Sequence, residues 1–151
     1  MSKCRIPKPS DPAAAARAEV VELLFEYVDV LRVHFEAVAE KHSLTPVQAK
    51  VLMFLNEATP MNRIAETLCC DPSNITGVVD RLEERGLLDR EEAPTDRRVK
   101  FLQVTGTGKK MRDAFAQDLF SDVPGMKGLS PAQVAEMHRM LARLCGRSAK
   151  N

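Results

Sequence analysis

Four pairs of a capping residue and a following proline predict where helices of this chain begin. The pairs are Asp11-Pro12, Thr45-Pro46, Asp71-Pro72 and Ser130-Pro131. The side-chain oxygen of the first residue can accept a hydrogen bond from an unpaired amide of the first turn, and proline lacks the amide that would otherwise have no partner. Two of the pairs also have glutamine three residues after the cap, at Gln48 and Gln133, which completes a capping box. A mainly helical chain is therefore expected.

The spacing of apolar residues extends each start signal into a helix. With 151 residues, of which 44% are hydrophobic and 28% charged, the chain has the size and composition of one globular domain. Apolar residues recur at three- and four-residue steps, and Gly86 supplies a C-terminal stop for the helix that starts at Pro72. The predicted helices cover residues 12–42, 46–56, 62–68 with Asn62 as cap, 72–85, a segment that starts after Thr105, and 131–146.

Two short strands are predicted after the fourth helix. Residues 87–91 and 98–104 alternate between apolar and polar side chains, and Pro94 and Asp96 lie in the connection. The charge changes sign at this hairpin, because residues 83–96 hold six acids and two bases, whereas residues 97–112 hold six bases and no acid. Such a change can mark a surface that binds an anionic partner, and it can also occur by chance on a solvated surface.

A short helix, a turn, a longer helix and a hairpin together form a winged helix-turn-helix. The expected fold class is mainly α, with about six helices plus a β-hairpin wing. Short polar side chains near the start of the fourth helix could reach base edges, a glycine lets the backbone come close, and an arginine can reach phosphate. The residues left outside its apolar stripe are Ser73, Asn74, Thr76, Gly77, Asp80 and Arg81. The alternative is that the Ser, Asn and Thr residues only cap the helix.

The segment from Leu68 to Gly108 resembles the DNA-binding core of the MarR family of bacterial regulators. The resemblance rests on Asn74-Ile75-Thr76, Val79-Asp80-Arg81-Leu82-Glu83, Gly86-Leu87-Leu88 with Arg90, Asp96-Arg97-Arg98, and Val104-Thr105 followed by Gly108. It implies one domain over residues 12–148, after a disordered tail at 1–11. Residues 12–42 and 105–148 would form a helical dimerisation region. Residues 45–104 would form the winged lobe, with the helix-turn-helix at about 61–85 and the wing at 87–104.

The resemblance also implies a function. The chain would be a homodimeric, sequence-specific transcriptional regulator, more often a repressor than an activator, that binds a near-palindromic double-stranded DNA operator. Arg97 matches the wing arginine that enters the minor groove, and Asp96 would orient it through a charge-assisted bond. Arg98 and Lys100 would contact phosphate or, for Arg98, another part of the protein. Some members carry Arg or Lys where Gly77 stands, so this chain lacks that contact.

Family members often bind a small aromatic or phenolic effector between the dimerisation region and the DNA-binding lobe. Here a ligand carboxylate could meet Arg32 and His34, and the apolar part could lie against Phe35, Met53 and Phe54. The alternative is that all five serve the core or the surface. No cofactor is expected.

Two other sensing chemistries are possible. Cys69 lies in the predicted turn and could sense oxidants, whereas Cys4 lies in the tail and Cys70 is expected in the core. The chain holds three histidines, at positions 34, 42 and 138, but without metal-ligand spacing, so no metal site is predicted.

Other protein classes fit less well. An enzyme is not expected, because we find no nucleophile–base pair, no metal spacing and no phosphate-binding loop. The sequence has no apolar run long enough to span a membrane and no signal-peptide core, so a cytoplasmic location is expected. The main alternative is a winged helix that binds proteins and has lost DNA binding.

Overall fold

The computed structural model describes residues 9–68, 72–92 and 100–147 of the chain. Within these ranges it has six helices and one three-stranded sheet, which confirms the mainly helical winged fold. The elements are α1 Pro12–Lys41, α2 Pro46–Phe54, β1 Thr59–Pro60, α3 Met61–Thr67, α4 Pro72–Glu84, β2 Leu88–Glu92, β3 Lys100–Val104, α5 Gly106–Ser121 and α6 Pro131–Leu144. Most of the tail expected at residues 1–11 lies outside the described residues.

Three of the four pairs of capping residue and proline form caps, and Thr105 caps α5 as predicted, by accepting a hydrogen bond from the Gly108 amide. Asp11 accepts hydrogen bonds from the first-turn amides of α1, and Thr45 and Ser130 each form a complete capping box at the starts of α2 and α6. The fourth predicted cap, Asp71, lies outside the described residues. Four helix starts are therefore set by side chains close in sequence, which is why they could be predicted.

The predicted cap of α3 is wrong. The helix starts at Met61, after Pro60, and has no side-chain cap bond. The Asn62 side chain instead accepts a hydrogen bond from the amide of Arg63 at 2.9 Å. Asn62 lies inside the first turn, where its oxygen reaches only the next amide.

The wing sheet has one strand more than predicted. Thr59-Pro60, a further pair of capping residue and proline, forms β1 and pairs antiparallel with Leu102 and Phe101 of β3. The strand order is β1-β3-β2, so β1 lies at an edge, where proline is tolerated. A two-residue strand is too short to show any periodicity, so no sequence pattern could reveal it.

The core lies at the lobe end of the molecule. The largest fully buried side chains come from α2 to α5 and the sheet: Phe115, Leu52, Leu55, Ile64, Ile75, Leu82, Leu88, Leu102, Val51 and Val79. By contrast, α1 buries only Val38 and Ala39 near its end, and α6 buries no residue. The core therefore joins the winged lobe to the end of α1 and to α5, whereas most of α1 and most of α6 lack cover.

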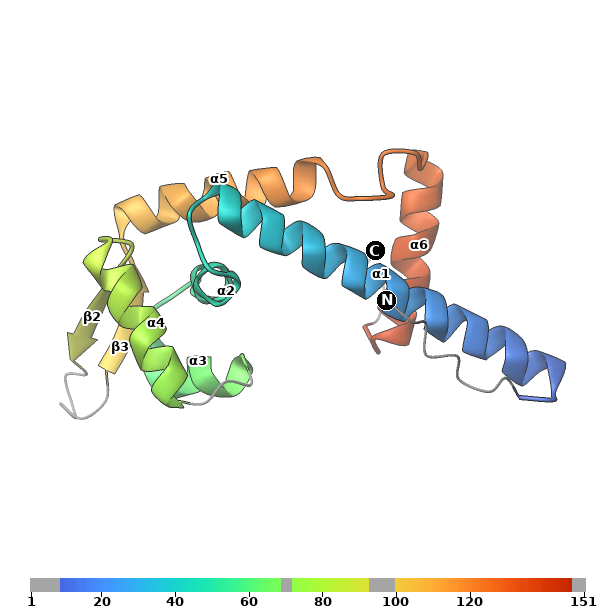
Figure 1. Ribbon diagram of the computed structural model, residues 1–151, viewed down its shortest axis with the longest axis horizontal. Coiled ribbons are helices and arrows are strands. Elements are labelled where there is room, and N and C mark those ends of the chain that lie inside the picture. Colours follow the sequence, from blue (N-terminus) through green and yellow to red (C-terminus); the bar gives the residue numbers. More distant parts are fainter. Residues whose placement is uncertain (1–8, 69–71, 93–99, 148–151) are drawn as a thin grey trace.

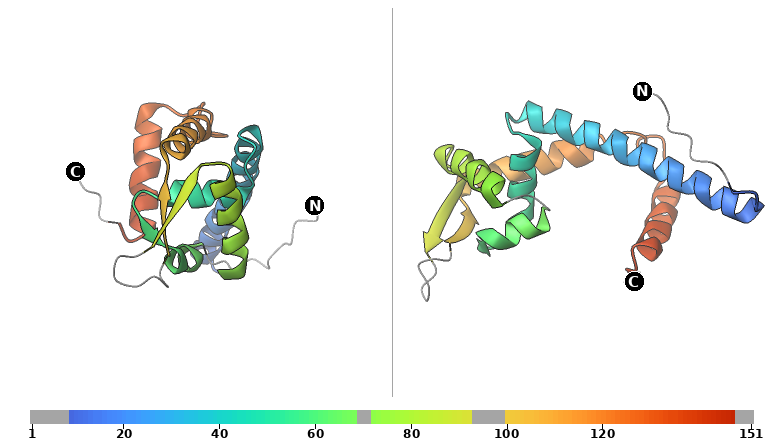
Figure 2. Two further views of the ribbon diagram at one scale, coloured as in Figure 1. Left: turned by 90° about the vertical axis from the view of Figure 1, so that its left-hand side faces the viewer. Right: turned by 60° about the horizontal axis from the view of Figure 1, so that its bottom comes forward.

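The winged lobe and the long helices occupy different ends of the molecule. Figure 1 shows α1 as a long diagonal rod, with the winged lobe beside one end and the other end projecting beyond α6, and Figure 2 shows the same extension. Helix α5 runs beside the C-terminal half of α1 and connects the sheet to the loop before α6. Within the described parts of the chain, no helix is long and apolar enough to cross a membrane.

Two glycines fit the junction between wing and helices. Gly86 has φ 65°, a left-handed conformation that ends α4 at little steric cost. Gly108 packs so closely against the sheet that a Cβ atom there would lie 2.0 Å from the Leu87 carbonyl oxygen. Any side chain at position 108 would therefore force α5 away from Leu87 and Val104.

Candidate nucleic-acid interface

Helix α4 is amphipathic and presents its polar side to solvent. Ile75, Val79 and Leu82 are fully buried in the lobe core and hold the helix in place. The opposite face carries residues predicted to contact DNA, and the exposed ones are Asn74, Thr76, Gly77 and Arg81. Asp80 is partly exposed, and the side chain of Ser73 lies outside the described part. We call α4 the reading helix, because Asn74, Gly77 and Arg81 on its polar face are exposed.

A guanidinium group joins the reading helix to the wing. Arg90 on β2 donates a hydrogen bond from Nη2 to Asp80 Oδ1, and its Nη1 lies 3.3 Å from Glu83 Oε2. The Arg90 side chain is 27% exposed, and its Nε atom is buried without a partner. We call these three residues the Arg90 brace. Asp80 was predicted to contact DNA, but in the structure its carboxylate bonds Arg90 within the protein.

The wing strands lead toward the predicted minor-groove residues. Strands β2 and β3 pair antiparallel from Leu88 opposite Val104 to Glu92 opposite Lys100. Lys100 is partly exposed at the end of this ladder. Asp96, Arg97 and Arg98 lie in the connection at 93–99, outside the described residues.

Arginine and threonine side chains tie the lobe to the long helices. Arg85 donates to the Ser43 carbonyl at 2.6 Å, and Arg112 donates to the Leu55 carbonyl at 2.8 Å. Thr105 donates to the Gly86 carbonyl at 2.7 Å, where the reading helix has ended. The position of the reading helix is thereby linked to α1 and α5.

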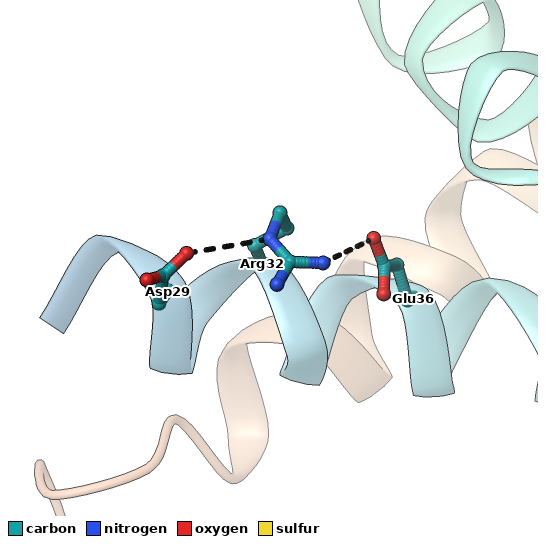
Figure 3. A network of polar contacts seen from close by, with 3 residues as sticks. All are labelled: Asp29, Arg32 and Glu36. Atoms are coloured by element: carbon teal, nitrogen blue, oxygen red, sulfur yellow. Dashed lines mark hydrogen bonds and ion pairs between the residues drawn. The ribbon is translucent and has the colours of Figure 1, made fainter. Parts of the chain in front are cut away.

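The two polar residues of the predicted effector set bond other groups of the protein. Arg32 is exposed and pairs with Glu36 at 2.9 Å and Asp29 at 3.5 Å (Figure 3), and Glu36 raises the pKa of its guanidinium above the ordinary value. His34, two positions on, points to another side of the helix. Its Nε2 atom donates to the Leu119 carbonyl at 3.0 Å. Both polar groups are engaged within the protein.

The apolar effector candidates pack on the core. The Phe35 ring meets Phe115 edge to face at 5.3 Å between centroids. Met53 and Phe54, on α2, are partly buried against the same core. These contacts accord with the alternative reading, in which the residues serve the core.

The seam between α1 and α5 contains a cluster that sequence reasoning missed. Asp118 on α5 accepts hydrogen bonds from Lys41 at 2.9 Å and His42 at 2.8 Å. The two partners lower the pKa of the Asp118 carboxyl below its ordinary value, because both bonds favour the carboxylate. Nothing in the sequence pairs position 118 with position 42, since packing of α1 on α5 creates the contact.

An apolar surface lies on the long helices, in the region expected to form the dimer. Large hydrophobic side chains are exposed on α1, α5 and α6: Val20, Val21, Leu23, Phe25, Val28, Val30, Val33, Phe120, Val134, Met140 and Leu144. On α1 they lie on more than one side, since Phe25 and Leu23 are about 200° apart around the axis. We call this the uncovered helical surface.

The cysteine predicted to sense oxidants, Cys69, is not among the described residues. Cys4, Cys69 and Cys70 lie outside the described residues, and Cys145 is exposed just after α6. Over the described ranges, no group of three or more His, Cys, Asp and Glu side chains could hold a metal ion.

Comparison with known proteins relates this architecture to one family. The sequence model of the MarR family matches residues 44–100, which run from the start of the lobe to β3. The HTH-type transcriptional regulator MhqR of Bacillus subtilis is 31% identical over 119 residues, covering 78% of this chain and 82% of that protein. The fold matches apo MarR from E. coli with a TM-score of 0.74 at 20% identity, over 82% of this chain and 93% of that one. CouR from Rhodococcus jostii RHA1, bound to p-coumaroyl-CoA, is 26% identical with a TM-score of 0.59, over 94% and 97%.

Proposed function

The chain belongs to the MarR family of transcriptional regulators, and we propose that it represses transcription as a homodimer on a near-palindromic operator. Members of the family are transcriptional regulators and not enzymes. The observation that carries the proposal is the reading helix, whose apolar side is buried while Asn74, Gly77 and Arg81 on the opposite side are exposed. Since bacterial DNA lies in the cytoplasm, the protein would act there.

The reading helix would enter the major groove and the wing would reach the adjacent minor groove. Asn74 and Thr76 have side chains of the type that bonds base edges, and Arg81 can reach phosphate one turn later. We assign Asp80 a positioning role through the Arg90 brace. The other proposed contacts are Ser73, Gly77, Asp96, Arg97, Arg98 and Lys100.

The uncovered helical surface supports the homodimer. Monomeric soluble proteins rarely expose large continuous apolar patches, and a helix that is apolar on several sides is normally buried. Helices α1 and α6 have little cover from their own chain, so a second copy would bury them. The symmetric contact would also set the distance between two reading helices.

A small molecule would modulate DNA binding. The relative CouR is bound to p-coumaroyl-CoA, a ligand with an aromatic group, which supports an aromatic or phenolic effector here. Arg32, His34, Phe35, Met53 and Phe54 remain the proposed contacts. Arg32 and His34 would have to exchange their present partners, Glu36 and the Leu119 carbonyl, for the ligand. A ligand shifts the equilibrium only if it binds two conformations with different affinity.

Titration of a labelled duplex tests the proposal. The duplex would cover the region upstream of the gene for this chain, and a shuffled duplex of equal length would serve as control. We expect tighter binding to the upstream duplex, with affinity falling as salt rises because phosphate contacts release counterions. Equal, weak binding to both duplexes would favour the protein-interaction module. Adding p-coumarate or a thiol oxidant would separate an aromatic effector from sensing through Cys69.

A further inference from the structure

Gly77 occupies the outermost position of the reading helix. It lies two residues after Ile75 and two residues before Val79, both fully buried. Two steps along a helix correspond to about 200°, so Gly77 points directly away from the core. A side chain at this position would project farther from the lobe than one at any neighbouring position.

The fold gives no reason for a glycine there. Gly77 does not have a left-handed φ, unlike Gly86 at 65°, and an added Cβ would meet no atom within 4 Å, unlike at Gly108. Glycine is the least favourable residue inside a helix apart from proline, because it loses the most backbone freedom. The residue therefore weakens α4 without any packing advantage within the chain.

The neighbours of Gly77 indicate what lies outside. Asn74 is three positions earlier and Arg81 four positions later, so both flank Gly77 on the same exposed face. Their side chains could reach a base edge and a phosphate only if the helix axis comes close to the DNA. A bulky group between them would hold the axis away and stretch their hydrogen bonds beyond the usual limit near 3.2 Å.

We propose that Gly77 is the point of closest approach between the reading helix and the base edges of the major groove, and that its missing side chain determines operator specificity. The inference rests on the proposed DNA-binding function. In this arrangement the backbone of α4 itself contacts the base edges, and the space left by Gly77 allows Asn74 to reach its hydrogen-bonding partner.

A size series at position 77 tests the proposal. The probe would be a duplex that the wild-type protein selects from a random library, and the variants would be Gly77→Ala, Gly77→Leu and Gly77→Arg. Gly77→Ala should raise the melting temperature by about 2 °C, because alanine favours the helix, yet weaken binding about tenfold. Gly77→Leu should weaken binding to the duplex further.

The control is Gly128→Ala, in the loop before α6, where an added Cβ also meets nothing within 4 Å. It should leave the affinity unchanged. Unchanged affinity for Gly77→Ala, or tighter binding by Gly77→Arg to the same duplex, would overturn the inference while the DNA-binding function stands. If the wild-type protein selects no sequence at all, the inference falls together with the proposed function.

Discussion

Arg90 on β2 donates a hydrogen bond to the Asp80 carboxylate on α4, and this bond fastens the wing to the reading helix. Glu83, one turn further along α4, binds the other terminal nitrogen of the same guanidinium. The orientation of the wing relative to the reading helix therefore depends on one planar group held by two carboxylates. Two surfaces that would bind neighbouring grooves of one duplex are set by a contact within the protein.

Loss of the Arg90 brace should destabilise the lobe. Arg90→Met keeps most of the side-chain length but leaves two carboxylates without their cation. We expect a loss of about 1–2 kcal/mol in the free energy of unfolding, since hydrogen bonds to charged groups are among the stronger ones and this pair is partly screened. Urea denaturation of the variant and the wild type measures this difference in the free energy of unfolding. Arg17→Met, which removes the exposed pair with Asp11 at 3.9 Å, is the matched control and should cost less than about 0.5 kcal/mol.

Arg97→Ala should weaken operator binding by about 1–3 kcal/mol, if Arg97 is the minor-groove contact of the wing. Fluorescence anisotropy with the upstream duplex measures the change. Arg17→Ala removes a cation from the start of α1, far from the wing in Figure 1, and should have no such effect. A loss below about 0.3 kcal/mol for Arg97→Ala would contradict a direct contact.

A charge placed on the uncovered helical surface should separate the two subunits. Met140 on α6 is 58% exposed in the single chain and would be buried by a second copy. Met140→Asp should cost about 2 kcal/mol or more and raise the dimer dissociation constant at least tenfold. Sedimentation velocity measures the distribution of monomer and dimer. Lys50→Asp, on the exposed side of α2, introduces an acid elsewhere and should leave a dimer intact.

The seam between α1 and α5 should make stability depend on pH. The bonds from Lys41 and His42 lower the pKa of Asp118, so its stabilising effect is present above the ordinary value and is lost as pH falls through the lowered one. Asp118→Asn should therefore lower the urea midpoint at pH 7, and its difference from wild type should shrink below about pH 4. Asp113→Asn, an exposed acid 3.8 Å from Arg112, is the control. A difference that is constant from pH 7 to pH 3 would rule out this origin.

Sequence reasoning succeeded where one residue acts on its near neighbours. Thr45 and Ser130 cap helices whose first turns they join, and Gly86 ends α4 through its own backbone conformation. It failed where the partner is remote or the element is very short. Strand β1 consists of Thr59 and Pro60 alone, and only its pairing with β3 makes it a strand.

In the candidate site, too, the sequence predicted what depends on near neighbours and missed what depends on remote partners. The exposure of Asn74, Thr76 and Gly77 follows from the helical period of the apolar residues between them. The bond between Asp80 and Arg90 does not follow from the helical period, because it depends on the angle at which β2 passes the reading helix. His34 could be placed on α1 but not assigned its partner, since the Leu119 carbonyl reaches it only when α5 packs alongside.

By itself the sequence determined the helix starts other than that of α3, the polar face of the reading helix and the resemblance to the MarR family, because these depend on residues a few positions apart. Only the tertiary structure decided that Arg90 holds Asp80, that Asp118 bonds His42, and that most of α1 and α6 lacks cover. Such features depend on how the helices and strands pack, and packing brings together residues that no local pattern relates. The helical period predicts which side of a helix is apolar, but the structure of the whole chain is needed to show which apolar sides remain exposed.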